Sequence, residues 1–321
     1  MEVLVTGGTG FLGQHLTKAL LERGHGVRLM GRNFAQVESL ISAGALPVPV
    51  DLRDSEAVSD ACANVEAVYH VGALSAPWGK RSDFFEINVG GTEAVIAGCL
   101  KHHVRRLIYV SSPSVVFNGY DQHNVTEKVS YPRRFASIYS LTKKLGEDAV
   151  NRAASDIEMV ILRPKAIFGP GDQSLLPRLI AAARQGRLPQ IGDGQNRVDL
   201  TYVENVVHAL LLSLDASEAK GKTSTITNDE HVPLWEVIRV VLRRLGLSTQ
   251  LRRVPLPAAL AAASLMEARA ALTGKEPMMT RYSAAILGRT QTYDISAARR
   301  DLGYTPRVTF AEGMERTIAA L

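Results

Sequence analysis

The stretch VTGGTGFLG, residues 5–13, decides the fold of this 321-residue chain. It follows an apolar run at the N-terminus and opens a helical pattern at 12–24, so its glycines lie at a strand-to-helix turn. Gly7, Gly10 and Gly13 allow a tight turn and let the backbone approach a pyrophosphate, to which a helix N-terminus offers N–H groups and a positive dipole. Their even spacing is a variant of the dinucleotide-binding fingerprint. A tight turn without a ligand is the alternative interpretation.

Strand and helix patterns alternate through the first half of the chain. Helical patterns separate the predicted strands, which are residues 2–7, 27–32, 46–52, 66–72, 106–112 and 158–164. This alternation predicts an α/β fold, a Rossmann-type doubly wound parallel sheet with helices on both faces. We predict a dinucleotide-binding domain at residues 1–170 and a smaller, mainly helical C-terminal substrate lobe in most of 171–321. A strand near 222–228 is expected to return to the first domain.

Composition excludes several classes of protein. Hydrophobic residues make up 46% of the chain and charged residues 21%, which is typical of globular rather than disordered proteins. The net charge of +5 comes without interleaved aromatic residues, so we expect no nucleic-acid partner. Cys62 and Cys99 lie far apart without metal-ligand spacing, and we therefore expect free thiols, no metal and a cytoplasmic location.

No apolar run reaches the roughly 20 residues of a membrane span, and the N-terminus does not resemble a signal peptide. The closest stretch, VPLPAALAAASLMEARAAL at 254–272, is interrupted by Glu267 and Arg269. We interpret it as one or two buried helices of the substrate lobe, with a membrane-surface helix as the alternative. Such an apolar lobe suits an acyl chain or a sterol-like body better than a sugar.

A second motif, SIYSLTKKLGED at 137–148, places Tyr139 and Lys143 one helical turn apart on the same face. The strand at 106–112 ends in serines, at the edge of the sheet where parallel strands end and ligands bind. These two stretches and the glycine loop therefore converge on one place.

The end of the second strand bears on the coenzyme. An acidic residue about 20 residues past the glycines would bind a free ribose 2′-hydroxyl, but this chain has Gly31 followed by Arg32. Arg32 can pair with a 2′-phosphate, which favours NADP(H); an exposed Arg32 in an enzyme that uses NAD(H) is the alternative. Asp51 is a candidate acceptor for the adenine amino group, with helix capping as its alternative role.

The glycine loop, VSS at 110–112 and YSLTK at 139–143 together resemble the extended short-chain dehydrogenase/reductase superfamily. ILRPKAIFGPGD, GDGQNRVDLTYVENV and YDISAARRDLGYTP are similar to its later landmarks, so the resemblance covers essentially the whole chain. SSPSVVFNG and GDGQNRVDLTYVEN look closest to the 3β-hydroxysteroid dehydrogenase-like branch. APWGKRSDFFEINVGGT and SLLPRLIAAARQGRL resemble bacterial 2-alkyl-3-oxoalkanoate reductases.

The resemblance implies the catalytic roles. Tyr139 is expected to protonate the carbonyl oxygen during reduction and to act as the base in the reverse direction. Lys143, together with the oxidised nicotinamide, is expected to lower the pKa of Tyr139 and to bind the nicotinamide ribose. Ser112 is our choice for the serine that holds the substrate oxygen, with Ser111 and Ser114 as alternatives.

The resemblance also implies a set of residues that contact the coenzyme. They are Gly7, Thr9, Gly10, Phe11, Leu12, Gly13, Arg32, Asp51, Leu52, Gly72, Ala73, Tyr139, Lys143 and Pro164. Gly72 departs from the alanine that the family usually has, a change that we expect to be tolerated. Asn88 matches an asparagine of the family and supports the site, while a helix cap is an equal alternative.

The predicted function is an NADP(H)-preferring oxidoreductase, with NAD(H) as the alternative coenzyme. It would interconvert a secondary alcohol and a ketone on a hydrophobic small molecule, either a 3-oxoacyl or 2-alkyl-3-oxo acid or a sterol-like body. Two alternatives stay open: a sugar-nucleotide epimerase or dehydratase with bound NAD, and a regulator that senses NADP(H) without turnover. Arg32 and the apolar lobe disfavour the first, and the Tyr139–Lys143 pair disfavours the second. Family habit predicts a homodimer through helices 88–103 and 139–154.

Overall fold

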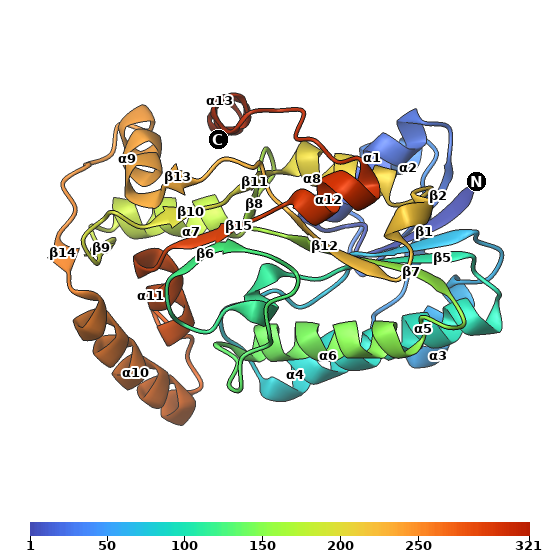
Figure 1. Cartoon of the computed structure of the whole chain (residues 1–321), viewed down its shortest axis with the longest axis horizontal. Coiled ribbons are helices and arrows are strands. Elements are labelled where there is room, and N and C mark those ends of the chain that lie inside the picture. Colours follow the sequence, from blue (N-terminus) through green and yellow to red (C-terminus); the bar gives the residue numbers. More distant parts are fainter.

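The computed structural model describes the backbone of residues 1–321 and all side chains except that of Leu175. Its centre is a seven-stranded sheet in the order β12-β7-β5-β4-β1-β2-β3, in which every pair of neighbours runs parallel (Figure 1). The strands are β1 (Glu2–Thr6), β2 (Gly26–Gly31), β3 (Leu46–Pro49), β4 (Ala67–His70), β5 (Arg106–Val110), β7 (Glu158–Pro164) and β12 (Lys222–Ile226). The order reverses between β1 and β4, which is where ligands bind to such sheets.

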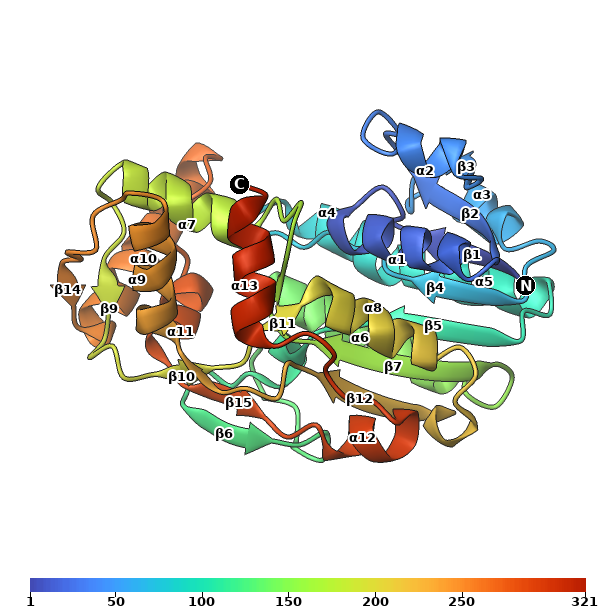
Figure 2. The same ribbon diagram turned by 90° about the horizontal axis from the view of Figure 1, so that it is seen from above.

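The central strands are apolar on both faces because helices cover both faces. On β1, Val3 and Val5 belong to one hydrophobic core and Leu4 belongs to the core on the opposite face. Figure 1 shows one helical layer above the sheet and the other below it, and Figure 2 shows the strands face-on. One layer contains α1 (Phe11–Glu22) and α8 (Val203–Leu212), and the other contains α3 (Ser55–Ala61), α5 (Gly91–Lys101) and α6 (Ile138–Arg152). The predicted doubly wound fold is confirmed.

A second, mixed sheet lies beside the first and was not predicted. Its order is β13-β10-β15-β6. The strands are β6 (Gln122–Val125), β10 (Arg197–Val198), β13 (Val232–Pro233) and β15 (Gln291–Tyr293). Two further pairs join β8 (Ile167–Phe168) to β11 (Thr201–Tyr202) and β9 (Gln190–Ile191) to β14 (Arg253–Val254).

The C-terminal lobe has its own core. Trp235 is fully buried there among side chains of three helices and β9, and its indole N–H donates to the Leu287 carbonyl oxygen at 3.1 Å. The lobe contains α7 (Leu175–Arg184), α9 (Leu234–Arg244), α10 (Leu256–Thr273) and α11 (Arg281–Gly288). The remaining helical elements are α2 (Glu38–Ser42), α4 (Arg81–Phe85), η1 (Glu86–Gly90), η2 (Pro113–Val116), η3 (Ser217–Ala219), α12 (Ser296–Leu302) and α13 (Phe310–Ala319). The domain boundary near residue 170 stays a prediction.

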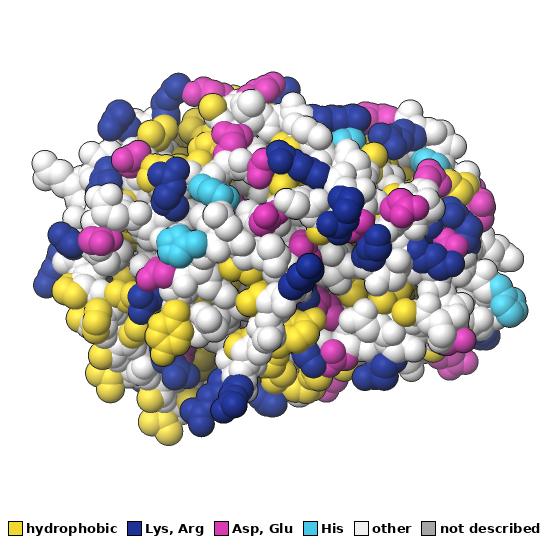
Figure 3. Space-filling view, in the orientation of Figure 1, with side chains coloured by type: hydrophobic (Ala, Val, Ile, Leu, Met, Phe, Trp, Pro, Cys, Tyr) yellow, Lys and Arg dark blue, Asp and Glu magenta, His cyan; other side chains and the backbone are white. Residues whose placement is uncertain are grey.

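The expectation that residues 254–272 form buried helices is wrong. They lie mainly in one helix, α10, which buries only alanines: Ala259, Ala263 and Ala270. Leu256 and Leu260 pack against the core of this lobe but are only partly buried, and Leu265 and Leu272 are 75% and 90% exposed. Figure 3 shows hydrophobic side chains gathered over α10 and α11 on this face. The prediction failed because alanines at helical spacing supply the packing stripe, so the apolar composition overstates the buried surface. Among the described residues, no helix is long and apolar enough to cross a bilayer.

Candidate active site

In the turn between β1 and α1, glycines allow the backbone to pack closely against the segment after β4 and against the turn itself. Gly7 has a φ of +66°, and a Cβ on it would lie 2.5 Å from the Cα of Gly72, just after β4. A Cβ on Gly13 would lie 2.2 Å from the Gly7 carbonyl oxygen. Gly10 is the N-cap of α1 and offers no side chain to bond its N–H groups. This bare helix terminus fits a pyrophosphate, which needs close backbone and free donors.

The other residues that we predicted to contact the coenzyme near this turn differ in how deeply they are buried. Thr9 and Phe11 in the turn, and Ala73 after β4, are half-buried at the carboxyl edge of the sheet. Leu12 is buried in the core beneath α1, and Leu52 packs against the core on the other face. The side chain of Leu12 therefore serves packing.

Charged residues cluster where β2 and β3 end. Arg32 follows β2, its side chain is 68% exposed, and its Nη1 lies 3.6 Å from Oδ2 of Asp51. Arg53, which was not predicted, donates to both oxygens of that carboxylate at 3.1 and 2.8 Å. The hydrogen bond from Arg53 lowers the pKa of Asp51 to about 2. The alternative role of Asp51 as a helix cap is wrong, because Asp54 caps α3 by accepting from the Ala57 N–H.

Helix α6 carries the tyrosine and lysine of the second motif. Ser137 caps it by accepting a hydrogen bond from the Ser140 N–H at 3.1 Å, which sets Tyr139 in the first turn. Lys143 follows one turn later and is buried, with its Nζ 4.0 Å from the centroid of the Tyr109 ring on β5. The two side chains therefore lie over the sheet on the same side of the helix.

Asn88 ties α6 to the segment after β4. It lies inside η1, where its Oδ1 accepts from the Leu74 N–H at 2.7 Å and its Nδ2 donates to the Leu74 carbonyl oxygen at 3.1 Å. The same Nδ2 donates to Oγ1 of Thr142 at 3.0 Å. Its alternative role as a helix cap is wrong. Asn88 instead fixes Leu74, the residue directly before Ser75, and Ser75 lies next to the Tyr139 hydroxyl.

Two serines lie beside the phenol of Tyr139. Ser112 follows β5, and it and Ser75 hydrogen-bond Tyr139, although only Ser112 was predicted. The Oγ of Ser112 also accepts from the Ser114 N–H at 3.2 Å, so its position is fixed at the start of η2. Ser111 and Ser114 are buried. The only signal for Ser75 in the sequence is its place just after a central strand.

Burial is the largest influence on the pKa values of Tyr139 and Lys143. It raises the pKa of Tyr139, while the hydrogen bonds from Ser75 and Ser112 act in the opposite direction and are outweighed. Burial also lowers the pKa of Lys143 to about 7, against the effect of Glu147. The expected lowering of the pKa of Tyr139 is therefore not found in the protein alone, because low polarity disfavours the charged form of both groups.

Comparison with known proteins agrees with this geometry. The model of the 3-beta hydroxysteroid dehydrogenase/isomerase family matches residues 4–257. The chain belongs to this family.

Two curated relatives match along almost the whole chain. A 2-alkyl-3-oxoalkanoate reductase of Stenotrophomonas maltophilia is 38% identical, covering 100% of this chain and 99% of the relative. A decarboxylating sterol-4-alpha-carboxylate 3-dehydrogenase of Mus musculus is 35% identical, covering 98% and 89%. The chain is thus an enzyme of the dehydrogenase/reductase type. A solved structure, UDP-glucuronic acid 4-epimerase of Bacillus cereus in complex with NAD, shares the fold with a TM-score of 0.78 and 23% identity, covering 100% of this chain and 98% of that one.

In this member of the 3-beta hydroxysteroid dehydrogenase/isomerase family, a buried ion pair anchors α6 to β7. Glu147, one turn past Lys143, accepts from Nε and Nη2 of Arg163 at 2.7 and 2.6 Å. The Tyr131 hydroxyl donates to the same carboxylate at 2.7 Å. Pro164, a predicted coenzyme contact, is buried directly after Arg163 at the end of β7.

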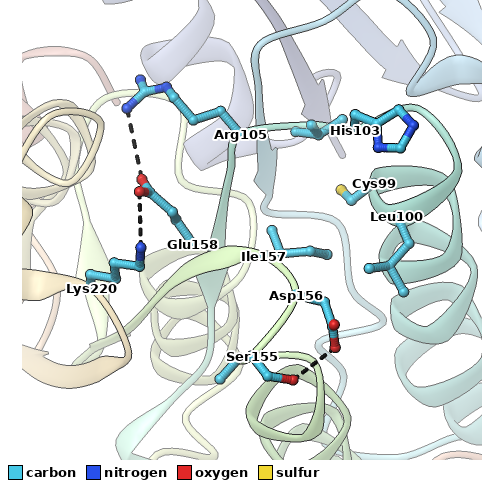
Figure 4. A pocket seen from close by; sticks show the side chains of 11 residues that line it. Cys99, Leu100, His103, Arg105, Ser155, Asp156, Ile157, Glu158 and Lys220 are labelled. Carbon is cyan, nitrogen blue, oxygen red and sulfur yellow. Dashed lines mark hydrogen bonds and ion pairs between the residues drawn. The ribbon is translucent and has the colours of Figure 1, made fainter.

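A cavity of about 530 Å³ lies at the opposite edge of the sheet (Figure 4). It opens where β5 and β7 begin, beside Arg105 and Glu158. Arg105 and Lys220 both pair with Glu158, at 3.9 and 3.1 Å, so both cations that line the cavity already have a carboxylate partner. Ser112, which bonds Tyr139, follows the carboxyl end of β5, whereas the cavity lies where β5 and β7 begin. The cavity is therefore separate from the site described above.

Proposed function

We propose that this enzyme interconverts a ketone and a secondary alcohol on a hydrophobic small molecule, with a nicotinamide dinucleotide as coenzyme. The observation that carries the proposal is the Tyr139 phenol, hydrogen-bonded by Ser75 and Ser112, with Lys143 one helical turn away. Three hydroxyl groups and one lysine at the carboxyl edge of a parallel sheet suit proton transfer to a carbonyl oxygen.

The protein groups act on the proton and the oxygen. Ser112 and Ser75 hold the substrate oxygen, and the Tyr139 phenol donates its proton to that oxygen in reduction or removes it in oxidation. A raised pKa keeps the phenol protonated at neutral pH, which favours its role as an acid and hence reduction of the ketone. Lys143 binds the ribose and supplies positive charge when it is protonated. A bound nicotinamide supplies or accepts the hydride.

We propose NADP(H) as the preferred coenzyme, with NAD(H) also accepted. Arg32 is mostly exposed and Arg53 lies on the other side of Asp51, so two guanidinium groups flank one carboxylate. The excess of one positive charge suits a 2′-phosphate, which planar guanidinium groups bind with two hydrogen bonds.

The proposed substrate is a 3-oxo acid with a long or branched apolar body, or a sterol-like acid. In the names of both curated relatives, the reacting carbon is next to the carbon that bears the carboxylate. The apolar side chains on α10 and α11 suit such a body better than a sugar (Figure 3). We further propose a cytoplasmic homodimer.

The test of the function is a turnover screen with the purified chain. NADPH and NADH oxidation is measured with a 2-alkyl-3-oxoalkanoate, a 3-oxosteroid and a UDP-sugar as substrates. We expect turnover of the oxo acid or the steroid and none of the sugar nucleotide. Turnover of the UDP-sugar alone, with coenzyme that copurifies in stoichiometric amount, would replace the proposal with an epimerase or dehydratase.

A further inference from the structure

Lys165 is a lysine that the proposed reaction does not use. It follows Pro164 at the carboxyl end of β7, and the pairing of β5 with β7 aligns Val110 with Leu162. One residue further, the Ser111 N–H donates to the Leu162 carbonyl oxygen at 2.7 Å, so the chain still runs beside β7 directly before Ser112. Because neighbouring strands lie about 4.8 Å apart, Lys165 leaves the same edge of the sheet as the segment that carries Ser112.

The Lys165 ammonium has a sparse polar environment. It donates to Oε1 of Gln291 at 2.8 Å and lies 5.5 Å from the centroid of the Tyr293 ring. In the part of the chain that the structure describes, no carboxylate forms an ion pair with it. Asp199, the carboxylate that raises its pKa from a greater distance, is already bonded to Nδ1 of His231 at 2.6 Å.

This arrangement leaves a partly buried cation without a carboxylate in direct contact among the described residues. Burial lowers the pKa of Lys165 to about 8, so the side chain is still mostly charged at neutral pH. An ammonium has three donors, and one of them is used here. The nearby Tyr293 hydroxyl is buried and also lacks a hydrogen-bond partner among the described residues. Charge and donors in such surroundings are unfavourable unless an anionic ligand satisfies them.

Tyr282 on α11 connects this lysine to the catalytic tyrosine. Burial and the neighbouring Tyr139 both raise the pKa of Tyr282, and burial and Tyr282 in turn raise the pKa of Tyr293. Tyr282 therefore lies within electrostatic reach of both Tyr139 and Tyr293, and its ring packs against Phe117, five residues after Ser112, with the centroids 6.2 Å apart. Tyr139, Tyr282 and Lys165 are half-buried and keep part of their surface open to solvent, as one ligand that contacts Tyr139 and Lys165 together requires.

We propose that the Lys165 ammonium binds the carboxylate of a substrate whose carbonyl oxygen is bonded by Tyr139, so that the enzyme selects oxo acids over esters and simple ketones. This inference rests on the proposed function and assigns a cation to the acid group of its substrate. A compact ammonium suits a single carboxylate that arrives without a fixed orientation.

The test compares an acid with its ester. Oxidation of a 2-alkyl-3-hydroxyalkanoate and of its methyl ester is measured with NADP⁺ and NAD⁺ for the wild-type chain, Lys165→Met and Lys165→Arg. Lys101→Met is the control, because Lys101 is an exposed lysine at the end of α5, paired with Asp60 at 2.8 Å. Coenzyme binding is titrated for every variant to show that the sheet is folded.

We expect Lys165→Met to lower kcat/KM for the acid about 10- to 100-fold, the usual effect of losing a hydrogen bond to a charged group. The loss should be mainly in KM, the ester should be unaffected, Lys165→Arg should recover part of the activity, and Lys101→Met should match the wild type. An equal loss for acid and ester, or no loss for the acid, would overturn the inference.

Two outcomes separate this inference from the function on which it rests. A wild-type enzyme that oxidises acid and ester equally well keeps the proposed function and overturns the role of Lys165. A wild-type enzyme that oxidises neither with either coenzyme, and that also turns over neither the oxo acid nor the steroid in the screen above, overturns both. If Lys165→Met does not fold, inhibition of the wild type decides: a 2-alkylalkanoate should bind at least about 10-fold more tightly than its methyl ester, and equal binding would contradict the proposal.

Discussion

At Tyr139 and Lys143, burial shifts each pKa toward the neutral form, while neighbouring polar and charged groups shift it toward the charged form. The phenol stays protonated and the pKa of the ammonium falls to about 7, because burial disfavours the charged form of each group. The protein alone therefore holds an acid ready to donate and a lysine that is charged only in part at neutral pH. Sequence spacing predicted that the two share a helix face, but the balance between burial and charge depends on residues that lie far away in the sequence.

Arg32 gives the residue-scale prediction about the coenzyme. Arg32→Ala should raise KM for NADPH about 10-fold or more and leave KM for NADH within twofold, because only the 2′-phosphate needs the guanidinium. The KM values of both coenzymes with one substrate provide the measurement. Arg28→Ala is the control, since this arginine of β2 donates to the Ala63 carbonyl oxygen and not toward Asp51. An unchanged NADPH/NADH ratio in Arg32→Ala would refute the preference.

At the scale of elements, α6 owes its position to one buried ion pair. The Glu147 carboxylate is fully buried and the Arg163 side chain is 4% exposed, so neither charge can turn to water if the other is removed. This pair holds the helix that carries Tyr139 and Lys143 against β7, the strand that leads to Lys165.

Removal of one partner of the Glu147–Arg163 ion pair should therefore destabilise the fold. Glu147→Gln should lower the free energy of unfolding by about 3–5 kcal/mol, since it leaves the Arg163 charge buried and unpaired. Chemical denaturation followed by circular dichroism measures the change. Asp148→Asn is a matched control at the next position, where the carboxylate pairs with Lys144 near the surface and should contribute about 1 kcal/mol or less. Equal effects of the two substitutions would contradict this role of the buried pair.

Some elements could be predicted from the sequence and others could not. Long apolar runs such as residues 158–164, and the glycine turn at 7–13, have strong local signals, and the structure has a strand and a strand-to-helix turn at these places. The strands of the second sheet are two to four residues long and have no repeating pattern to detect. Ser75 and Lys165 were missed because their place near the site depends on how the strands of the folded chain pair. Arg53 lies only two residues from Asp51, but a lone arginine in a loop carries no distinctive pattern.

At the scale of the whole molecule, the outer surface of α6 suits contact with a second copy. Leu141 and Leu145 lie one turn apart and are half-buried in the single chain, and Leu100 on the neighbouring α5 is 41% exposed. The predicted homodimer through α5 and α6 would cover this apolar surface, and in a two-fold dimer the same surface patch of each copy would face the other.

Leu145→Asp should therefore give a monomer at micromolar concentration, because it introduces a charge into an apolar interface. Light scattering of the purified protein measures the mass. Leu265→Asp changes an exposed leucine on α10 instead and should leave the mass of the wild type. A wild-type monomer, or a dimer that survives Leu145→Asp, would contradict the proposed interface.

The most direct test of the whole account is the turnover number of Tyr139→Phe on the preferred substrate, measured together with its coenzyme dissociation constant. Loss of the single phenolic oxygen should lower kcat at least about 100-fold, while the coenzyme dissociation constant changes far less because the glycine turn and α1 are untouched. A Tyr139→Phe enzyme that keeps full turnover would show that another group handles the proton, and the proposed chemistry would be wrong.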